Sequence, residues 1–163
     1  MNEFLTIAFP ACSLWIDSVP DFTEAQIAFI ETQRVGRLAT ADRAARPHVV
    51  PVCYARDSAS FYIALDAKPK RVAPARLKRV RNILDNPHVA LVIDRYSDDW
   101  GALAYLLIRG AAALLLPGDE EHQYAVALLR ARYPQYRAMP IEEQPVIVIR
   151  MESVVAWGAI DKT

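Results

Sequence analysis

Short apolar runs separated by polar turns constrain the fold of this chain more than any other feature of its sequence. Runs of this kind predict β-strands. The predicted strands are residues 35–41, 47–55, 61–65, 88–96, 104–116, 145–151 and 154–159. Pro51 cannot donate a hydrogen bond to a strand ladder, so the second strand is predicted to contain a bulge or to lie at an unpaired edge.

Three helices are predicted between these strands. A capping-box spacing of Thr23 and Gln26 begins the first, which extends to about Gln33. The second covers residues 75–86, and the third covers residues 119–133, where acids come first and bases last, as the helix dipole favours. The residues predicted to face the core are Ile27, Phe29 and Ile30, then Leu77, Val80, Ile83 and Leu84, then Tyr124, Ala125, Leu128 and Leu129.

The order of these elements favours a mainly β fold with inserted helices. Strands and helices do not alternate as they do in a doubly wound parallel sheet. The first three strands are joined by short turns, so an antiparallel meander is their simplest arrangement, and a closed barrel would remove exposed strand edges. At 18.3 kDa and 53% hydrophobic residues, the chain predicts one domain over residues 21–163, with residues 1–20 as an N-terminal extension.

Charge and cysteine content restrict the partners and the compartment. Nineteen basic and nineteen acidic residues give a net charge of zero, which argues against nucleic acid and favours small-molecule or protein partners. The apolar run 4–16 has no base near it and is interrupted by Pro10, so we expect neither export nor membrane insertion. Two cysteines, Cys12 and Cys53, are too few for a disulfide framework, and a cytoplasmic protein is expected.

Common catalytic and metal-binding motifs are missing from the sequence. It contains no GxSxG, P-loop, GxGxxG or HExxH pattern. The three histidines have no local partners at metal-ligand spacing, so no metal site is predicted and each histidine is interpreted as structural or exposed. No side chain stands out as a catalytic acid or base, and solvent, Tyr62 or Tyr105 are the candidate proton sources.

One segment carries unusual charge. Residues 68–81 hold seven bases and no acid, on a chain whose net charge is zero. Cations so close together repel one another unless an anion binds between them, and the start of a helix adds backbone N–H groups, so the segment predicts a phosphate site. A solvated helix face is one alternative. A nucleic-acid patch is another, although no aromatic residues lie within the segment for base stacking.

Five strings, taken in order, resemble the pyridoxamine 5'-phosphate oxidase-like, flavin-binding split β-barrel superfamily. They are RLAT (37–40), PHVVPV (47–52), LDAKPKR (65–71), the run 81–100, and RGAA (109–112). The closest likeness is to its deazaflavin-dependent branch, and it covers roughly residues 22–160. The resemblance implies an antiparallel split β-barrel that forms a homodimer, with a flavin-type cofactor in a groove at the subunit interface.

The resemblance also implies roles for particular residues. The implied cofactor contacts are Arg37, Ala39 and Thr40 along the groove, Ala64 and Leu65 beside the ring system, Lys68, Lys70, Arg71, Arg76 and Arg79 on the phosphate, Asn82 fixing the loop, and Trp100 packing on the ring or covering the groove from the partner subunit. Some of them also have a purely structural interpretation: Ala39, Ala64 and Leu65 as core, Thr40 as an ordinary strand hydroxyl, and Trp100 as a hydrophobic plug.

The expected function is that of an oxidoreductase. Coenzyme F-420, a deazaflavin, would be gripped by its phosphate and would transfer hydride to or from a small organic substrate. FMN is the alternative cofactor for the same fold, and a non-catalytic protein that binds flavin or haem is the alternative from another class. Residues specific to pyridoxamine phosphate oxidation are not recognisable near Trp157, so vitamin synthesis is not expected.

Overall fold

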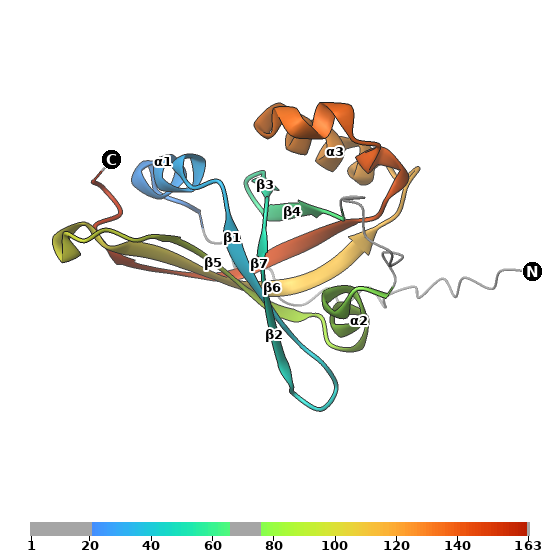
Figure 1. Cartoon of the computed structure of the whole chain (residues 1–163), viewed down its shortest axis with the longest axis horizontal. Coiled ribbons are helices and arrows are strands. Elements are labelled where there is room, and N and C mark those ends of the chain that lie inside the picture. The colour runs from blue at the N-terminus through green and yellow to red at the C-terminus, as the bar shows by residue number, and fades with distance from the viewer. Residues whose placement is uncertain (1–20, 66–75, 163) are drawn as a thin grey trace, which may run out of the picture.

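The computed structural model describes residues 21–65 and 76–162, which form an antiparallel sheet with helices packed around it (Figure 1). The strands are β1 Gly36–Ala41, β2 Pro47–Val52, β3 Ala55–Arg56, β4 Ser60–Ala64, β5 His88–Arg95, β6 Ala104–Leu115 and β7 Val146–Gly158. The helices are α1 Glu24–Thr32, α2 Lys78–Asp85 and α3 Glu120–Arg132, with short 3-10 helices η2 Trp100–Ala102, η3 Pro134–Ala138 and η4 Ile141–Glu143. The expected mainly β class with inserted helices is confirmed.

The sheet is curled into a half-barrel. Its strands follow the order β2-β1-β5-β6-β7-β4-β3, and each neighbouring pair is antiparallel. In a flat sheet the outermost strands would lie about 29 Å apart, at about 4.8 Å per strand. The chain nevertheless passes from β2 to β3 through Cys53 and Tyr54 alone, a reach of at most about 11 Å. The two edges therefore approach each other, and the barrel is split instead of closed.

The predicted strand boundaries are wrong at two places in the chain. Residues 47–55 are not one strand: residues 47–52 pair with β1 at one end of the sheet, and residues 55–56 pair with β4 at the other. The first strands consequently form two separate hairpins and no meander. This places Pro51 in an edge strand, where its missing N–H costs no ladder bond, as predicted.

The second error lies at the C-terminal end of the chain. The strands predicted at 145–151 and 154–159 are one strand, β7, whose pairing with β6 shifts register beside Arg109 and Gly110. A bulge absorbs the extra residue, Glu152, without ending the strand. Strands β6 and β7 approach so closely here that a Cβ on Gly110 would lie 2.0 Å from the Arg150 carbonyl oxygen. Only glycine fits that position.

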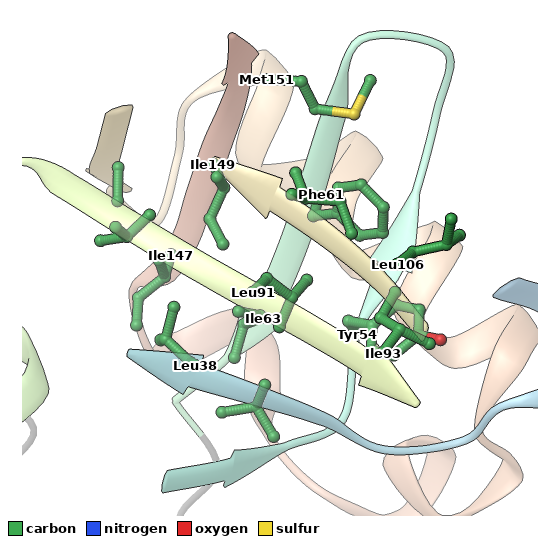
Figure 2. Packing of buried hydrophobic residues seen from close by; sticks show 14 of the residues in the cluster. Leu38, Tyr54, Phe61, Ile63, Leu91, Ile93, Leu106, Ile147, Ile149 and Met151 are labelled. Carbon is green, nitrogen blue, oxygen red and sulfur yellow. The ribbon is translucent and has the colours of Figure 1, made fainter. Parts of the chain in front are cut away.

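Two apolar layers account for the buried strands. One side of the sheet fills the half-barrel with a cluster that includes Leu38, Phe61, Leu91 and Ile149 (Figure 2). The other side of β4 and β7 packs against α3 through a second cluster that contains Tyr62, Val148 and Leu129 among its members. Strand β4 is buried at all five positions because both of its faces are covered.

The helices are in the expected places, but two of their apolar faces differ from the prediction. Helix α1 begins with the predicted capping box of Thr23 and Gln26. Helix α3 buries His122, Ala125, Val126 and Leu129, whereas the predicted Tyr124 is 48% exposed. In α2 the predicted Leu84 is 67% exposed. Each helix touches the sheet over a narrow stripe, which turns the neighbouring apolar positions toward solvent. No helix within residues 21–65 and 76–162 is long and apolar enough to cross a membrane.

The outer face of the sheet is apolar and open. Strand β6 alternates between the core and this face, so Tyr105 and Leu107 point outward opposite Trp157 and Val155 of β7. The Tyr105 and Trp157 rings stack at 5.5 Å, and Trp157 is 52% exposed. On the edge strand β2, Val49 is 58% exposed. The described part of the chain therefore leaves apolar sheet surface without a cover.

Candidate cofactor site

A stripe of polar contacts joins helix α2 to the hairpin of β1 and β2. Lys78, Asn82 and Asp85 are spaced four and three residues apart and therefore share one face of α2. The contacts are Lys78 Nζ to Asp42 Oδ2 at 2.8 Å, Asn82 Nδ2 to Thr40 Oγ1 at 2.9 Å, and Arg43 Nε to Asp85 Oδ1 at 3.7 Å. They fix the helix that carries part of the basic segment against the end of β1.

Asp42 is the most fully bonded side chain of this junction. The backbone N–H groups of Ala44 and Arg46 donate to its Oδ1 at 3.0 and 3.1 Å, and Arg46 Nε and Lys78 Nζ both donate to its Oδ2 at 2.8 Å. These hydrogen bonds, led by that of Lys78, hold the pKa of Asp42 well below its usual range. The carboxylate stays ionised and orients two cations next to each other.

Thr40 and Asn82 form a buried pair beneath the helix. Thr40 is 4% exposed and Asn82 is fully buried. Among the described residues, the Asn82 side-chain oxygen is buried without a hydrogen-bond partner. A buried acceptor without a hydrogen bond lowers the stability of the fold. A donor from outside the described residues, such as a ligand or water, would remove this cost. Both residues were predicted at the cofactor site, and the structure brings them together.

The start of α2 is cationic and has no side-chain cap. Arg76 is exposed just ahead of the helix, and Arg79 lies half-buried in its first turn. The N-cap residue is Leu77, which makes no side-chain hydrogen bond to the helix. An N-terminus of this kind attracts anions through its backbone N–H groups and its dipole. The other predicted phosphate residues, Lys68, Lys70 and Arg71, lie outside the described residues.

Comparison with protein-family models matches residues 22–158 to the family described as pyridoxamine 5'-phosphate oxidase. The chain belongs to the pyridoxamine 5'-phosphate oxidase family. The match covers both hairpins, α2, α3 and the long strands, so it includes the candidate site. The resemblance to this split-barrel superfamily is thus confirmed, whereas its deazaflavin branch stays a prediction.

Individual relatives include a reductase and haem proteins. The chain is 30% identical over 103 residues, 63% of its length and 70% of the relative's, to the 5a,11a-dehydrotetracycline/5a,11a-dehydrooxytetracycline reductase of Streptomyces rimosus subsp. rimosus. The heme storage protein HutZ of Vibrio cholerae has a TM-score of 0.66 and 16% identity, over 84% of this chain and 97% of that one. A heme binding protein of Mycobacterium smegmatis has a TM-score of 0.66 and 20% identity, over 83% and 53%. These solved structures support the fold alone.

The other residues predicted to line the groove do not lie on one surface of the protein. Arg37 and Ala39 point to the outer face of β1, where Arg37 Nη1 forms an ion pair with Asp94 Oδ1 at 2.7 Å. Thr40 points to the opposite face. Ala64 and Leu65 are 6% and 1% exposed, in different core clusters, as their structural interpretation expects.

Trp100 is 79% exposed in η2, so it does not plug the core of a single chain. Its side chain is exposed to solvent, and its place over a groove stays a prediction. Tyr105 is half-buried on the outer face of the sheet.

Tyr62 does not suit a proton-donor role. Its hydroxyl lies 2.8 Å from Asp57 Oδ2 and 3.1 Å from Glu121 Oε1, and the residue is 1% exposed. Burial, followed by these carboxylates, raises the pKa of Tyr62 well above its usual value. Of the two tyrosines proposed from sequence, only Tyr105 lies near solvent. Within the described ranges no three His, Cys, Asp or Glu side chains gather to hold a metal ion.

Sequence reasoning missed Asp42, Arg43 and Arg46. The segment DRAAR (42–46) was interpreted only as a polar turn between strands. An aspartate at the first position of a turn often binds the backbone N–H groups that follow it, and this was the available signal. Its pairing with Lys78, 36 residues away, could come only from the tertiary structure.

Proposed function

We propose that this protein is an oxidoreductase that binds a deazaflavin coenzyme of the F-420 type in a groove between two copies of the chain, and transfers hydride to or from a small organic substrate. The cationic, uncapped start of α2, held against β1 by Asp42 and Asn82, is the observation that carries this proposal. Such a site suits the phosphate of a flavin-type cofactor. The 30% identical reductase supports redox chemistry in this part of the family.

Each part of the chain would have a limited task. Arg76 and Arg79, together with the predicted Lys68, Lys70 and Arg71, would hold the phosphate, and Asn82 would position the segment ahead of α2. The bound coenzyme supplies the hydride chemistry. The protein orients the ring system and excludes water, with Trp100 as a wall of the groove. Tyr105 or solvent would supply a proton.

A homodimer would complete the site. The apolar face of β5, β6 and β7 has no cover from the described residues, and a two-fold axis would bury it against the same face of a second copy. Under this arrangement the groove lies beside the interface, and residues from both copies line it.

FMN is the second candidate cofactor, because the sequence resembles a flavin-binding superfamily and the matching family is described as an oxidase. FMN also carries a tricyclic ring and a phosphate, so the same cations would hold it. Haem is the third candidate, on the evidence of the two haem-binding relatives in fold.

A binding titration on dialysed protein separates these candidates. We expect F-420 to bind most tightly among F-420, FMN, FAD and haem, and turnover of a substrate panel with reduced coenzyme to follow. Saturable binding without hydride transfer to any substrate would favour a carrier. Tight binding of haem alone, with its absorption band, would contradict the proposal.

Charge reversal tests the phosphate site itself. Lys70→Glu combined with Arg71→Glu should abolish cofactor binding and leave the fold intact, because charge-assisted phosphate contacts contribute roughly 1.5 to 3 kcal/mol each. Circular dichroism checks the fold. Arg71→Glu is matched by Arg137→Glu, an exposed arginine of η3 outside the basic segment, which should bind cofactor normally. If Lys70→Glu/Arg71→Glu bound the cofactor as tightly as Arg137→Glu does, the basic segment would be only a solvated surface.

A further inference from the structure

The open outer face of the sheet carries charged side chains among its apolar ones. Arg37 of β1 and Asp94 of β5 neutralise each other, since Arg37 Nη1 lies 2.7 Å from Asp94 Oδ1. Arg109 of β6 and Glu152 of β7 are exposed, and neither side chain has a hydrogen bond or an ion pair within the described ranges. This face therefore presents one cation and one anion that are not neutralised within the chain.

Arg109 and Glu152 lie beside each other at the bulge between β6 and β7. Arg109 points outward opposite Ser153, and Glu152 is the extra residue directly before Ser153. Met151 and Val154 pack against the core of the half-barrel, so the two residues between them are turned away from it. The unpaired cation and the unpaired anion are thus neighbours on the same face of the sheet.

Association through this face would take both charges out of water. Their surroundings are apolar, because Ala90 lies opposite Arg109 on β5, and the cross-strand pair of Leu107 and Val155 follows along β6 and β7. An unpaired charge that loses its water strongly opposes association, and the cost is offset only when a charge of opposite sign meets it. A partner for this face must therefore present an anion to Arg109 and a cation to Glu152.

A second copy of the chain meets both requirements at once. Contacts across a two-fold axis are reciprocal, so a residue pair that meets at one place meets again, with the copies exchanged, at a second place. We infer that Arg109 of each copy forms an ion pair with Glu152 of the partner subunit, with the two-fold axis running between the two residues. The inference rests on the proposed homodimer and names what fixes its register, since apolar sheet faces alone could slide over each other.

Charge reversal followed by subunit mixing tests the pair. Arg109→Glu and Glu152→Arg each bring like charges together at both contacts, so each should raise the dimer dissociation constant at least about a hundredfold. Mixed in equal amounts, the two variants should form a heterodimer, because both contacts again join opposite charges. Light scattering coupled to size-exclusion chromatography measures the mass. Arg137→Glu and Glu143→Arg, exposed residues of η3 and η4, are matched controls and should dimerise as the wild type does.

Each result decides for or against the pair. Recovery of the dimer on mixing supports it and also shows that both variants are folded. A mixture that stays monomeric, while Arg109→Glu/Glu152→Arg in one chain restores the dimer, would place the ion pair within a chain and overturn the inference. Arg109→Gln and Glu152→Gln add no new charge, and a dissociation constant unchanged in both would overturn it as well.

The mass measurement needs no cofactor, so it separates this inference from the proposed coenzyme. If the reversals leave the dimer intact and F-420 binds, the ion pair is refuted and the proposed function stands. If mixing restores the dimer but no flavin or deazaflavin binds, the ion pair stands and the proposed coenzyme is wrong. A wild type that is monomeric at every concentration overturns the ion pair together with the homodimer.

Discussion

Asp42 shows how one buried carboxylate can join two elements that are distant in sequence. It lies in the β1–β2 turn, and it binds Lys78 of α2 as well as its own turn. Two cations contact its Oδ2, so their mutual repulsion is offset by the carboxylate between them. Asp42 thereby positions α2 against the turn.

We expect Asp42→Asn to lower the free energy of unfolding at neutral pH. Folding lowers the pKa of Asp42 below its unfolded value of about 3.9, so its stabilising effect is complete above that pH and disappears as the pH falls toward the folded value. Urea unfolding from about pH 7 to about pH 3 should show the difference between wild type and variant shrinking in acid.

A matched change at an exposed carboxylate provides the control. Asp161→Asn, near the C-terminus, should alter the free energy of unfolding by no more than about 0.5 kcal/mol. A difference between wild type and Asp42→Asn that stayed constant into acid would show that the carboxylate charge does not matter.

At the scale of elements, Arg132 fastens the end of α3 to the end of α1. Its Nη2 donates to the carbonyl oxygens of Ile30 and Gln33 at 2.7 and 2.8 Å, and its guanidinium lies over the rings of Tyr54 and Tyr133. The last carbonyls of a helix have no partner within the helix, and this arginine donates to two of the carbonyls at the end of α1. Tyr54 belongs to the connection between β2 and β3. Arg132 therefore also stabilises the place where the two edges of the split barrel approach each other.

Replacing Arg132 should loosen all three elements together. We expect Arg132→Met to lower the free energy of unfolding by about 1.5 to 3 kcal/mol, because the carbonyl oxygens of Ile30 and Gln33 are then left to share the single proton of the Tyr54 hydroxyl. Arg132→Lys should recover little of the loss, since a single ammonium cannot also bind Glu31 and the Tyr133 hydroxyl, which Nη1 and Nε of the arginine contact. Denaturant unfolding measures both, with the exposed Arg137→Met as control. Full recovery in Arg132→Lys would mean that charge alone is required.

At the scale of the whole molecule, the curled sheet decides which surfaces are covered. Its concave side is filled by side chains of the barrel core, and α3 covers the far side of β4 and β7. The outer face of β5, β6 and the C-terminal half of β7 receives no helix from the described residues. Apolar outward residues such as Leu107 and Val155 are cross-strand neighbours there, so the surface is continuous.

We expect the wild type to be a dimer and Leu107→Asp/Val155→Asp to be a monomer. Two carboxylates on each face would have to be desolvated on association, which opposes it strongly. Light scattering coupled to size-exclusion chromatography measures the mass. The cofactor titration should show lost affinity, because residues of both copies line the groove in the proposed arrangement. Leu84→Asp, on an exposed leucine of α2, is the control and should stay dimeric. A monomeric wild type would contradict this prediction.

Local patterns in the sequence were enough for the fold class. The capping box of Thr23 and Gln26 and the apolar runs of β4, β5 and β6 each depend on neighbours within a few residues, and each was found where expected. The break at Cys53 and Tyr54 and the bulge at Glu152 were missed. Both depend on which strands lie alongside, and no local pattern records that.

The candidate site was likewise predicted in part from the sequence, and the rest became visible only in the structure. The sequence by itself determined that cations crowd into residues 68–81, because charge density is a property of the chain, and the family resemblance added Thr40 and Asn82 as neighbours of a cofactor. Only the tertiary structure decided that these two residues bind each other, that Asp42 neutralises Lys78, and that Arg43 lies beside Asp85 of α2. Hydrogen bonds and ion pairs act over a few ångströms in space, and the folding of the sheet, not the order of residues, brings such partners together.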